Sequence, residues 1–118
     1  MESILTSVKK LIGLTEDYVQ FDQDIIMHIN SVFLNLTQIG VGPEEGFFIE
    51  DETAEWVDFI GDSAQLQAVK TYMYLKVKTL FDPHSLSGPV LQSMNEMIRE
   101  YEYRLMLAAE SLAEESTM

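Results

Sequence analysis

Asp82 and His84 stand two residues apart in the stretch LFDPHSLSGP, and this is the first place where side-chain chemistry is suggested. A carboxylate beside an imidazole could serve in acid–base catalysis or in a metal site. A metal site needs three or four ligands, and a nucleophilic site needs a Ser or Cys beside a base. Ser85 and Ser87 follow, but no nucleophile-elbow or oxyanion-hole motif surrounds them. The stretch therefore does not indicate catalysis.

The same stretch is explained more fully as a corner between two helices. Pro83 disfavours helical geometry at the residue before it, so the preceding helix must end near Phe81. Ser87 or Gly88 can cap the next helix, and Pro89 suits its first turn. We therefore interpret the stretch as a structural corner.

Glu96 and Glu100 are four residues apart on a predicted helix and form the second candidate for chemistry. All-α nucleotide pyrophosphohydrolases hold magnesium with helical Glu pairs of this kind. Arg99 and Arg104 stand within one turn of these acids and favour exposed ion pairs instead. The second acidic pair that such an enzyme needs is not found at helical spacing on another long helix. We expect no enzymatic activity, no metal and no cofactor.

The stretch from Glu44 to Asp62 holds eight carboxylates and no base, and it also carries large apolar side chains. Exposed aromatic residues are unusual without a partner, and aromatic anchors inside a polar rim are typical of binding surfaces. Two interpretations stay open: a solvated loop whose aromatics cap the core, and a surface that faces a channel or a partner. The second interpretation assigns that role to Glu44, Glu45, Phe47, Phe48, Glu50, Asp51, Glu52 and Trp56.

Three of the seven basic residues, Lys70, Lys76 and Lys78, lie on one predicted helix. They do not share one narrow face, and the formal net charge of the chain is −13. Nucleic-acid binding is therefore not indicated. We expect these lysines to meet an acidic surface on a neighbouring copy.

The elements that must position these residues are helical, because apolar residues recur at helical spacing between turn signals. A first short helix places Leu11 on its apolar face, and Gly13 ends it. Asp22 is predicted to cap a second helix that Gly40 closes. A short helix carries Trp56. A longer helix follows, capped by Asp62 and Gln65, with an apolar stripe made by Leu66, Val69, Met73, Val77 and Leu80.

The last helix is predicted from about residue 89 to about residue 114. Its apolar residues alternate at spacings of three and four through three heptads, which is longer and more regular than a small core requires: Leu91, Met94, Ile98, Tyr101, Leu105, Ala108 and Leu112. We expect Tyr101, Leu105 and Leu112 to contribute to self-association.

Composition sets the class of protein. The chain has 118 residues, 47% of them apolar, which suits one folded domain spanning residues 1–118, with a disordered tail from about residue 112. We expect an all-α fold of four to five helices in a small bundle, with a long C-terminal helix and one irregular acidic-aromatic loop. No apolar run approaches 18 residues and no signal peptide is evident, so we expect no membrane contact and a cytoplasmic origin.

The order of several residue strings resembles the small head–tail connector, or adaptor, proteins of tailed bacteriophages. The strings are KKLIGLTED, FDQDIIMHINSVFLNLTQIGVGP, FFIEDETAEWVDFI, VKTYMYLKVKTLFDP and EMIREYEYRL. The similarity spans nearly the whole chain, about residues 3–110. The features that carry the resemblance most are GVG, W-x-D-F-I, YLKVKxLFDP and E-x-E-x-RL in that order. The chain departs from one frequent family pattern at His84, where a second proline is often seen.

The resemblance implies a virion structural protein without catalytic residues, made in the host bacterium and located at the head–tail interface. Copies of the subunit would form a ring, usually dodecameric, beneath the portal protein. The ring would extend the DNA channel without binding DNA specifically, and would dock a head-closure or tail component. An acidic lumen suits such a conduit, because like charge keeps the duplex from sticking.

Two other classes of function stay open from the residues alone. One is an acidic DNA mimic that inhibits a basic host protein, since the chain is strongly acidic. The other is a small magnesium-dependent nucleotide pyrophosphohydrolase that uses Glu96 and Glu100.

Overall fold

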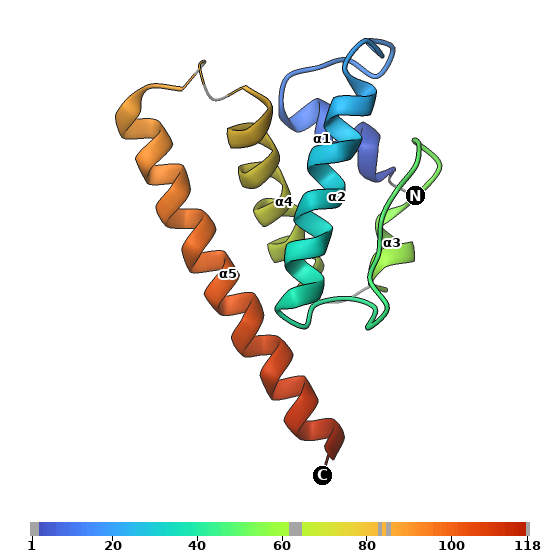
Figure 1. Cartoon of the computed structure of the whole chain (residues 1–118), viewed down its shortest axis with the longest axis vertical. Helices are drawn as coiled ribbons and strands as arrows, with labels where there is room; N and C mark the ends of the chain where they lie inside the picture. The colour runs from blue at the N-terminus through green and yellow to red at the C-terminus, as the bar shows by residue number, and fades with distance from the viewer. Residues whose placement is uncertain (1–2, 62–64, 83, 85, 118) are drawn as a thin grey trace.

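The chain is built from helices, as the apolar periodicity predicts. The computed structural model describes all residues except 1–2, 62–64, 83, 85 and 118, and it describes side chains as far as residue 111. The helices are α1 (Ile4–Leu11), α2 (Asp22–Gln38), α3 (Trp56–Phe59), α4 (Gln65–Phe81) and α5 (Gly88–Thr117) (Figure 1). Within these residues the one β-type pairing is an isolated bridge between Ser3 and Glu55. The predicted all-α class is confirmed.

The helix α4 lies at the centre of the arrangement. It packs against α2 on one side and α5 on the other, and α1 contacts both α2 and α4. The irregular segment between α2 and α3, residues 39–55, runs along the opposite edge of the molecule from α5 (Figure 1). The C-terminal half of α5 extends beyond the other helices. The molecule is elongated as a result, with principal extents of 48 × 35 × 20 Å.

The apolar stripes of the long helices form most of the core. The apolar residues Ile25, Ile29, Val32 and Leu36 recur at helical spacing along α2 and are buried, as are Val69, Met73 and Val77 of α4. Tyr72 and Leu75 are buried in addition. Two predictions were wrong, because Leu11 is 53% exposed and Leu80 is 45% exposed. Both residues stand at the end of a helix, where the neighbouring helix no longer covers the stripe.

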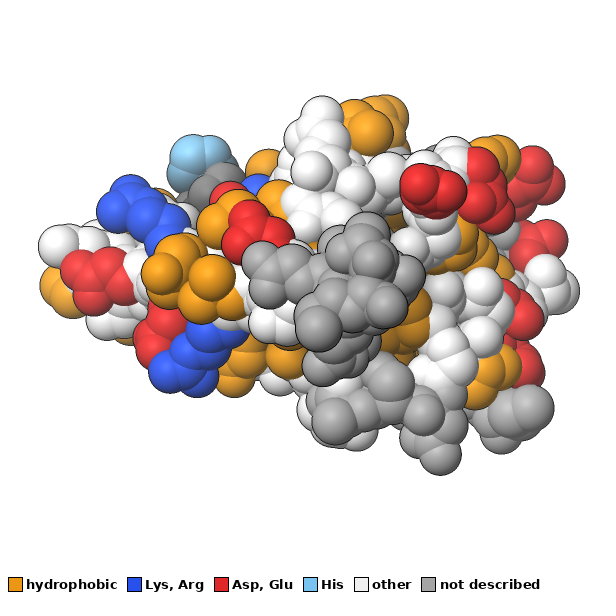
Figure 2. Space-filling view, turned by 90° about the horizontal axis from the view of Figure 1, so that it is seen from below, with side chains coloured by type: hydrophobic (Ala, Val, Ile, Leu, Met, Phe, Trp, Pro, Cys, Tyr) orange, Lys and Arg blue, Asp and Glu red, His pale blue; other side chains and the backbone are white. Residues whose placement is uncertain are grey.

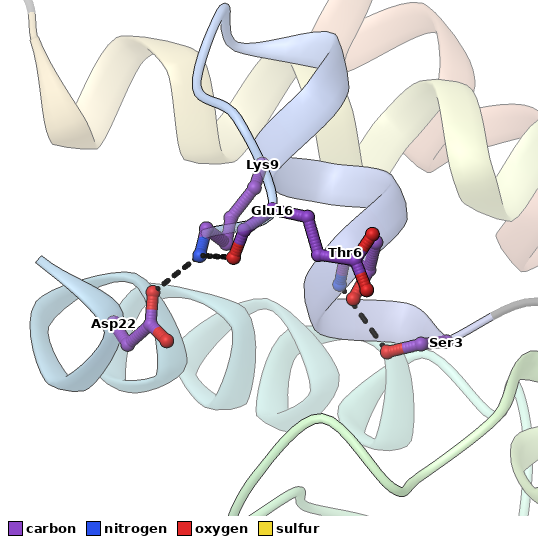
Figure 3. A network of polar contacts seen from close by, with 5 residues as sticks. All are labelled: Ser3, Thr6, Lys9, Glu16 and Asp22. Atoms are coloured by element: carbon purple, nitrogen blue, oxygen red, sulfur yellow. Dashed lines mark hydrogen bonds and ion pairs between the residues drawn. The ribbon is translucent and has the colours of Figure 1, made fainter. Parts of the chain in front are cut away.

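The start of α2 differs from the prediction. Asp22 is the first helical residue, and Phe21 occupies the N-cap position without a side-chain hydrogen bond. The Asp22 carboxylate instead faces Lys9, with Oδ1 2.8 Å from Nζ (Figure 3). Lys9 is 2% exposed and also donates to the Glu16 carbonyl at 3.0 Å. A buried charge is tolerated only when it is paired and hydrogen-bonded, so these contacts hold α1, the α1–α2 connection and α2 together.

Predicted helix ends are largely confirmed. Gly13 and Gly40 follow α1 and α2 with φ of 95° and 90°, a backbone region that glycine adopts at low cost. Ser3 caps α1 by accepting from the Thr6 amide at 3.2 Å (Figure 3). The predicted cap at Asp62 lies outside the described residues.

The end of α5 bears on two further predictions. Its backbone is helical to Thr117, whereas we expected disorder from about residue 112. The side chains of residues 112–118 lie outside the described part of the chain, so the disordered tail stays a prediction. None of the helices, over the described residues, has an apolar stretch long enough to cross a membrane.

Candidate functional site

The corner between α4 and α5 is built as the sequence predicts. α4 ends at Phe81, and the Asp82 amide still donates to the Lys78 carbonyl at 3.3 Å. At the start of α5, the Ser87 side chain accepts from the Val90 amide at 3.3 Å. Pro83 and Ser85 lie outside the described residues.

The two residues that suggested chemistry at this corner differ in exposure. His84 is exposed, while Asp82 lines a hollow of about 360 Å³ together with Asp24, His28 and two phenylalanines. Over the described residues, no group of three His, Asp or Glu side chains has a geometry that could hold a metal ion.

The acids of α5 have different surroundings. Glu96 and Glu100 are exposed, and Glu100 is paired with Arg104 four residues later. Both partners are more than half exposed, so the pair is a solvated helical ion pair of the predicted kind. Glu102 has a different role, since it accepts a hydrogen bond from Tyr72 at 2.8 Å.

The contact between Tyr72 and Glu102 is a feature that the sequence analysis missed. Tyr72 is fully buried on α4, and its hydroxyl also receives a hydrogen bond from Asn35 of α2. Burial first, and then the Glu102 carboxylate, raise the pKa of Tyr72 above its ordinary value. The node joins α2, α4 and α5. A tyrosine within an apolar stripe was the available signal, because a buried hydroxyl needs a partner.

The acidic segment between α2 and α3 divides its side chains between core and solvent. Its carboxylates Glu44, Glu45, Glu50, Asp51 and Glu52 are all exposed. Phe48 is 67% exposed, whereas Phe47 packs edge-on against Phe33 with ring centroids 5.0 Å apart. The first interpretation therefore holds for Phe47, which caps the core, while Phe48 faces solvent and the role of the segment toward a channel or a partner stays a prediction.

The backbone of this segment is held by side chains. Asn30 of α2 donates to the Ile49 carbonyl at 3.0 Å and accepts from its amide at 2.8 Å, as a neighbouring strand would. Asp51 accepts from the side chain and the amide of Thr53, and these hydrogen bonds lower the pKa of its carboxyl. The exposed acids are thus presented on an ordered loop.

Trp56 does not belong to the exposed surface to which the sequence assigned it. It is 2% exposed, and its ring nitrogen donates to Ser7 of α1 at 2.9 Å. The indole is large enough to fill the space between α1, α3 and α2, where Phe33 contacts it with centroids 6.3 Å apart. Trp56 is a core residue with one edge in a groove.

Two of the three α4 lysines lie over aromatic rings of their own chain. Lys70 Nζ lies 5.9 Å from the Trp56 ring centroid, and Lys76 Nζ lies 5.8 Å from that of Tyr72. Lys70, Lys76 and Lys78 are all half-buried. The predicted role of the three in meeting a neighbour stays a prediction.

Residues of the predicted self-association surface on α5 are covered within their own subunit. Leu105 is 2% exposed and packs into the core of its own subunit, and Tyr101 is half-buried against the same core. The regular pattern therefore serves the fold at these positions, so Leu105 does not face a neighbouring copy. The side chain of Leu112 lies outside the described residues.

The chain has a match among known protein families. A family model described as phage connector protein matches residues 4–111, which is most of the chain. No curated protein and no solved structure matches the chain significantly.

Proposed function

The chain belongs to the phage connector protein family, a family of structural proteins, and on that premise we propose that it is a ring-forming subunit at the head–tail joint of the virion. The family match over residues 4–111 is the observation that carries the proposal. The ring surrounds the DNA channel beneath the portal protein and docks a head-closure or tail component. We propose the dodecamer that is usual in this family.

The surface chemistry of the chain supports a passive conduit. Acidic side chains gather along the right-hand edge of the molecule, where residues 39–55 lie, and no Lys or Arg stands among the described side chains there (Figure 2). A lumen or rim of negative charge repels the phosphate backbone and leaves DNA free to pass. The role is structural and needs no catalytic group.

Neither alternative function gains a specific observation. Glu100, one of the two acids of the pyrophosphohydrolase hypothesis, is already paired with Arg104. The acidic segment of the DNA-mimic hypothesis contains Phe48, an exposed apolar ring that a phosphate mimic does not need.

Location in the particle tests the proposal directly. Phage in which this reading frame is inactivated should make DNA-filled heads that fail to join tails, and the purified protein should restore joining. Averaged cryo-electron images of complete particles should show its density as a ring below the portal. Complete, infective particles that lack the protein would refute the proposal.

Charge reversal tests the channel. Replacing Glu44 and Glu45 with Lys should slow DNA ejection from assembled particles, because the lumen would then attract phosphate. Reversing Glu16 and Asp17, two exposed acids of the α1–α2 connection, serves as a matched control. Equal ejection rates for both variants would remove these two acids from the channel.

A further inference from the structure

Exposed apolar side chains gather on one face of α2 and on the irregular segment beside it. Phe48 is 67% exposed, Met27 63% and Leu34 59%, so they are three of the five most exposed large apolar residues among the described side chains. Met27 and Leu34 are seven residues apart and therefore stand on the same face of α2. Leu34 and Phe48 line one hollow of about 320 Å³. These three residues form what we call the α2 patch.

The backbone that carries Phe48 is fixed on both sides. The side chain of Asn30, which lines the same hollow, hydrogen-bonds both the amide and the carbonyl of Ile49. On the other side, Phe47 packs against Phe33 with ring centroids 5.0 Å apart. A group that is already held in position loses less conformational entropy when it binds a partner. Phe48 is therefore preorganised for a contact.

The charges around the α2 patch have one sign. Glu45 lines the hollow, Glu50 stands two residues after Phe48, and both acids are exposed. The sequence contains no Lys or Arg from residue 11 to residue 69, so neither α2 nor the irregular segment supplies one to neutralise these acids. A complementary partner presents an apolar side chain with Lys or Arg beside it. DNA is not such a partner, because these acids repel its phosphates.

The other two of the five most exposed apolar residues match a docking surface less well. Val19 lies in the α1–α2 connection, and its hollow of about 200 Å³ is lined mainly by polar and charged side chains. Tyr103 lies on α5 beside the exposed ion pair of Glu100 and Arg104. That surface carries both signs of charge, so it selects no partner by charge.

A second copy of this chain is a poor partner for the α2 patch. Each copy carries a net charge of −13, so two acidic surfaces would be brought together. Four of the seven basic side chains already contact groups of their own subunit: Lys9 and Arg104 in ion pairs, and Lys70 and Lys76 over aromatic rings. A different protein with a basic surface meets the patch without this repulsion.

We propose that the α2 patch docks a segment of a different virion protein, whose apolar side chain enters the hollow between Leu34 and Phe48 and whose Lys or Arg residues face the surrounding acids. This inference rests on the proposed function and names a surface by which the ring binds a neighbouring component. A component docked here would continue the channel past Glu44 and Glu45. An apolar anchor enclosed by a polar rim is the pattern of an energetic hot spot.

Photo-cross-linking from the patch identifies the occupant. The chain contains no cysteine, so Leu34→Cys gives a single attachment point for a benzophenone maleimide. Leu34 is exposed, so the variant should fold, and thermal unfolding checks this. In complete particles assembled from labelled and unmodified subunits, illumination should join position 34 to a different virion protein. Mass spectrometry should place the cross-link at an apolar stretch with Lys or Arg beside it.

Leu107→Cys is the matched control, because Leu107 is an exposed leucine on α5. We expect roughly tenfold less of the same product from it, since it lies outside the α2 patch. A main product with a second copy of this chain would overturn the proposal. So would the absence of a product from position 34, equal yields from the two positions, or a cross-linked stretch without basic residues.

Substitutions at the patch provide a second, independent measurement. In phage that depend on the variant chain, Leu34→Asp should lower the yield of complete particles roughly tenfold, because a charge replaces the apolar contact. Leu107→Asp should leave the yield unchanged. Glu50→Lys should lower it roughly threefold by repelling the basic partner, while Asp17→Lys, at an exposed acid of the α1–α2 connection, should not.

The outcomes separate this inference from the proposed function. A normal yield with Leu34→Asp would overturn the docking surface and leave the connector role intact. Complete, infective particles that lack the protein altogether would refute the connector role itself.

Discussion

The irregular segment of residues 39–55 and the long helix α5 reach order by opposite means. α5 is regular along its length, yet among its described side chains only Met94, Ile98 and Leu105 are buried. The irregular segment has no repeating backbone pattern, yet Val41 and Ile49 are 2% exposed. A helix satisfies its own backbone groups, whereas an irregular segment needs buried side chains and side-chain hydrogen bonds to hold its shape. Single substitutions should therefore cost more in or around the segment than on the outer face of α5.

Removing the indole at the end of the segment should have the largest effect. Trp56→Ala deletes a ring that is 2% exposed and hydrogen-bonded to Ser7, and should lower the free energy of unfolding by about 3–5 kcal/mol. Tyr103→Ala on α5 removes an aromatic side chain that is 59% exposed, and should change stability by about 0.5 kcal/mol or less. Urea unfolding of the two variants measures the difference. Similar losses would contradict the comparison.

A methyl group added inside the segment should lower the free energy of unfolding nearly as much as the loss of the indole. At Gly42, φ is +88° and a Cβ atom would come within 2.4 Å of the Phe59 ring. Overpacking and the left-handed backbone together should cost about 2–4 kcal/mol in Gly42→Ala.

Gly46→Ala is the matched control, because its φ is +93° and the nearest atom, Thr37 Oγ1, would lie 3.9 Å from the new Cβ. It should incur only the backbone cost of about 1–2 kcal/mol. Equal unfolding midpoints for the two glycine variants would show that the segment or the Phe59 ring shifts at no cost to make room for the new methyl group.

Loss of the amide that holds the segment should have an intermediate effect. Asn30→Ala leaves both backbone groups of the buried Ile49 without their partner, and should cost about 1–3 kcal/mol. Hydrogen exchange at the Ile49 amide should become faster. Ser31→Ala, one position along α2 and exposed, should leave that exchange rate unchanged.

The hydrogen bond from Tyr72 of α4 to Glu102 of α5 should contribute less to stability than the Asn30 contacts, and its contribution depends on pH. Tyr72→Phe removes a hydrogen bond to the partly exposed Glu102 and should cost about 1–2 kcal/mol at pH 7. Because the folded protein raises the pKa of Tyr72, the hydroxyl stabilises the fold fully below about pH 10 and loses this contribution as pH rises further. The difference in unfolding free energy between the unmodified chain and the variant should therefore narrow above pH 10. A constant difference up to pH 11.5 would contradict the assignment.

The exposed ion pair on α5 should have the smallest effect. Arg104→Ala removes a partner from Glu100 where both side chains are more than half exposed, and should change stability by about 0.5 kcal/mol or less. Thermal unfolding at low and high salt should give nearly the same difference. A loss above about 1 kcal/mol would mean that this face of α5 contributes more than the comparison allows.

Much of the fold could be predicted from the sequence, because the signals that specify helices and their ends lie within short stretches of the chain. Periodic apolar residues, Gly13, Gly40 and the Ser87 cap are read from short stretches, and the helices begin and end close to where these signals stand. Asp22 shows the limit of this reasoning. Its type suits an N-cap, but the structure uses its charge to pair with the buried Lys9, a contact between helices that no local rule contains.

The candidate surfaces were predicted only in part. The acids of residues 44–52 are exposed as expected, because charged side chains remain solvated unless they are paired. Phe47 and Phe48 are identical neighbours in the sequence, and only the packing of Phe33 and Phe59 decides that one is covered and the other is free. The same holds for Trp56 and Leu105, whose patterns suggested contact surfaces and whose side chains complete the core.

The sequence alone therefore determined the helical class, the corner after α4, the strongly acidic character of the chain and its resemblance to phage connectors. These follow from composition, periodicity and order along the chain. The tertiary structure decided which aromatic residues face solvent, which lysine is buried, and which side chains of the acidic segment complete the core. Such features depend on segments that are distant in sequence and adjacent in space, so no local pattern could supply them.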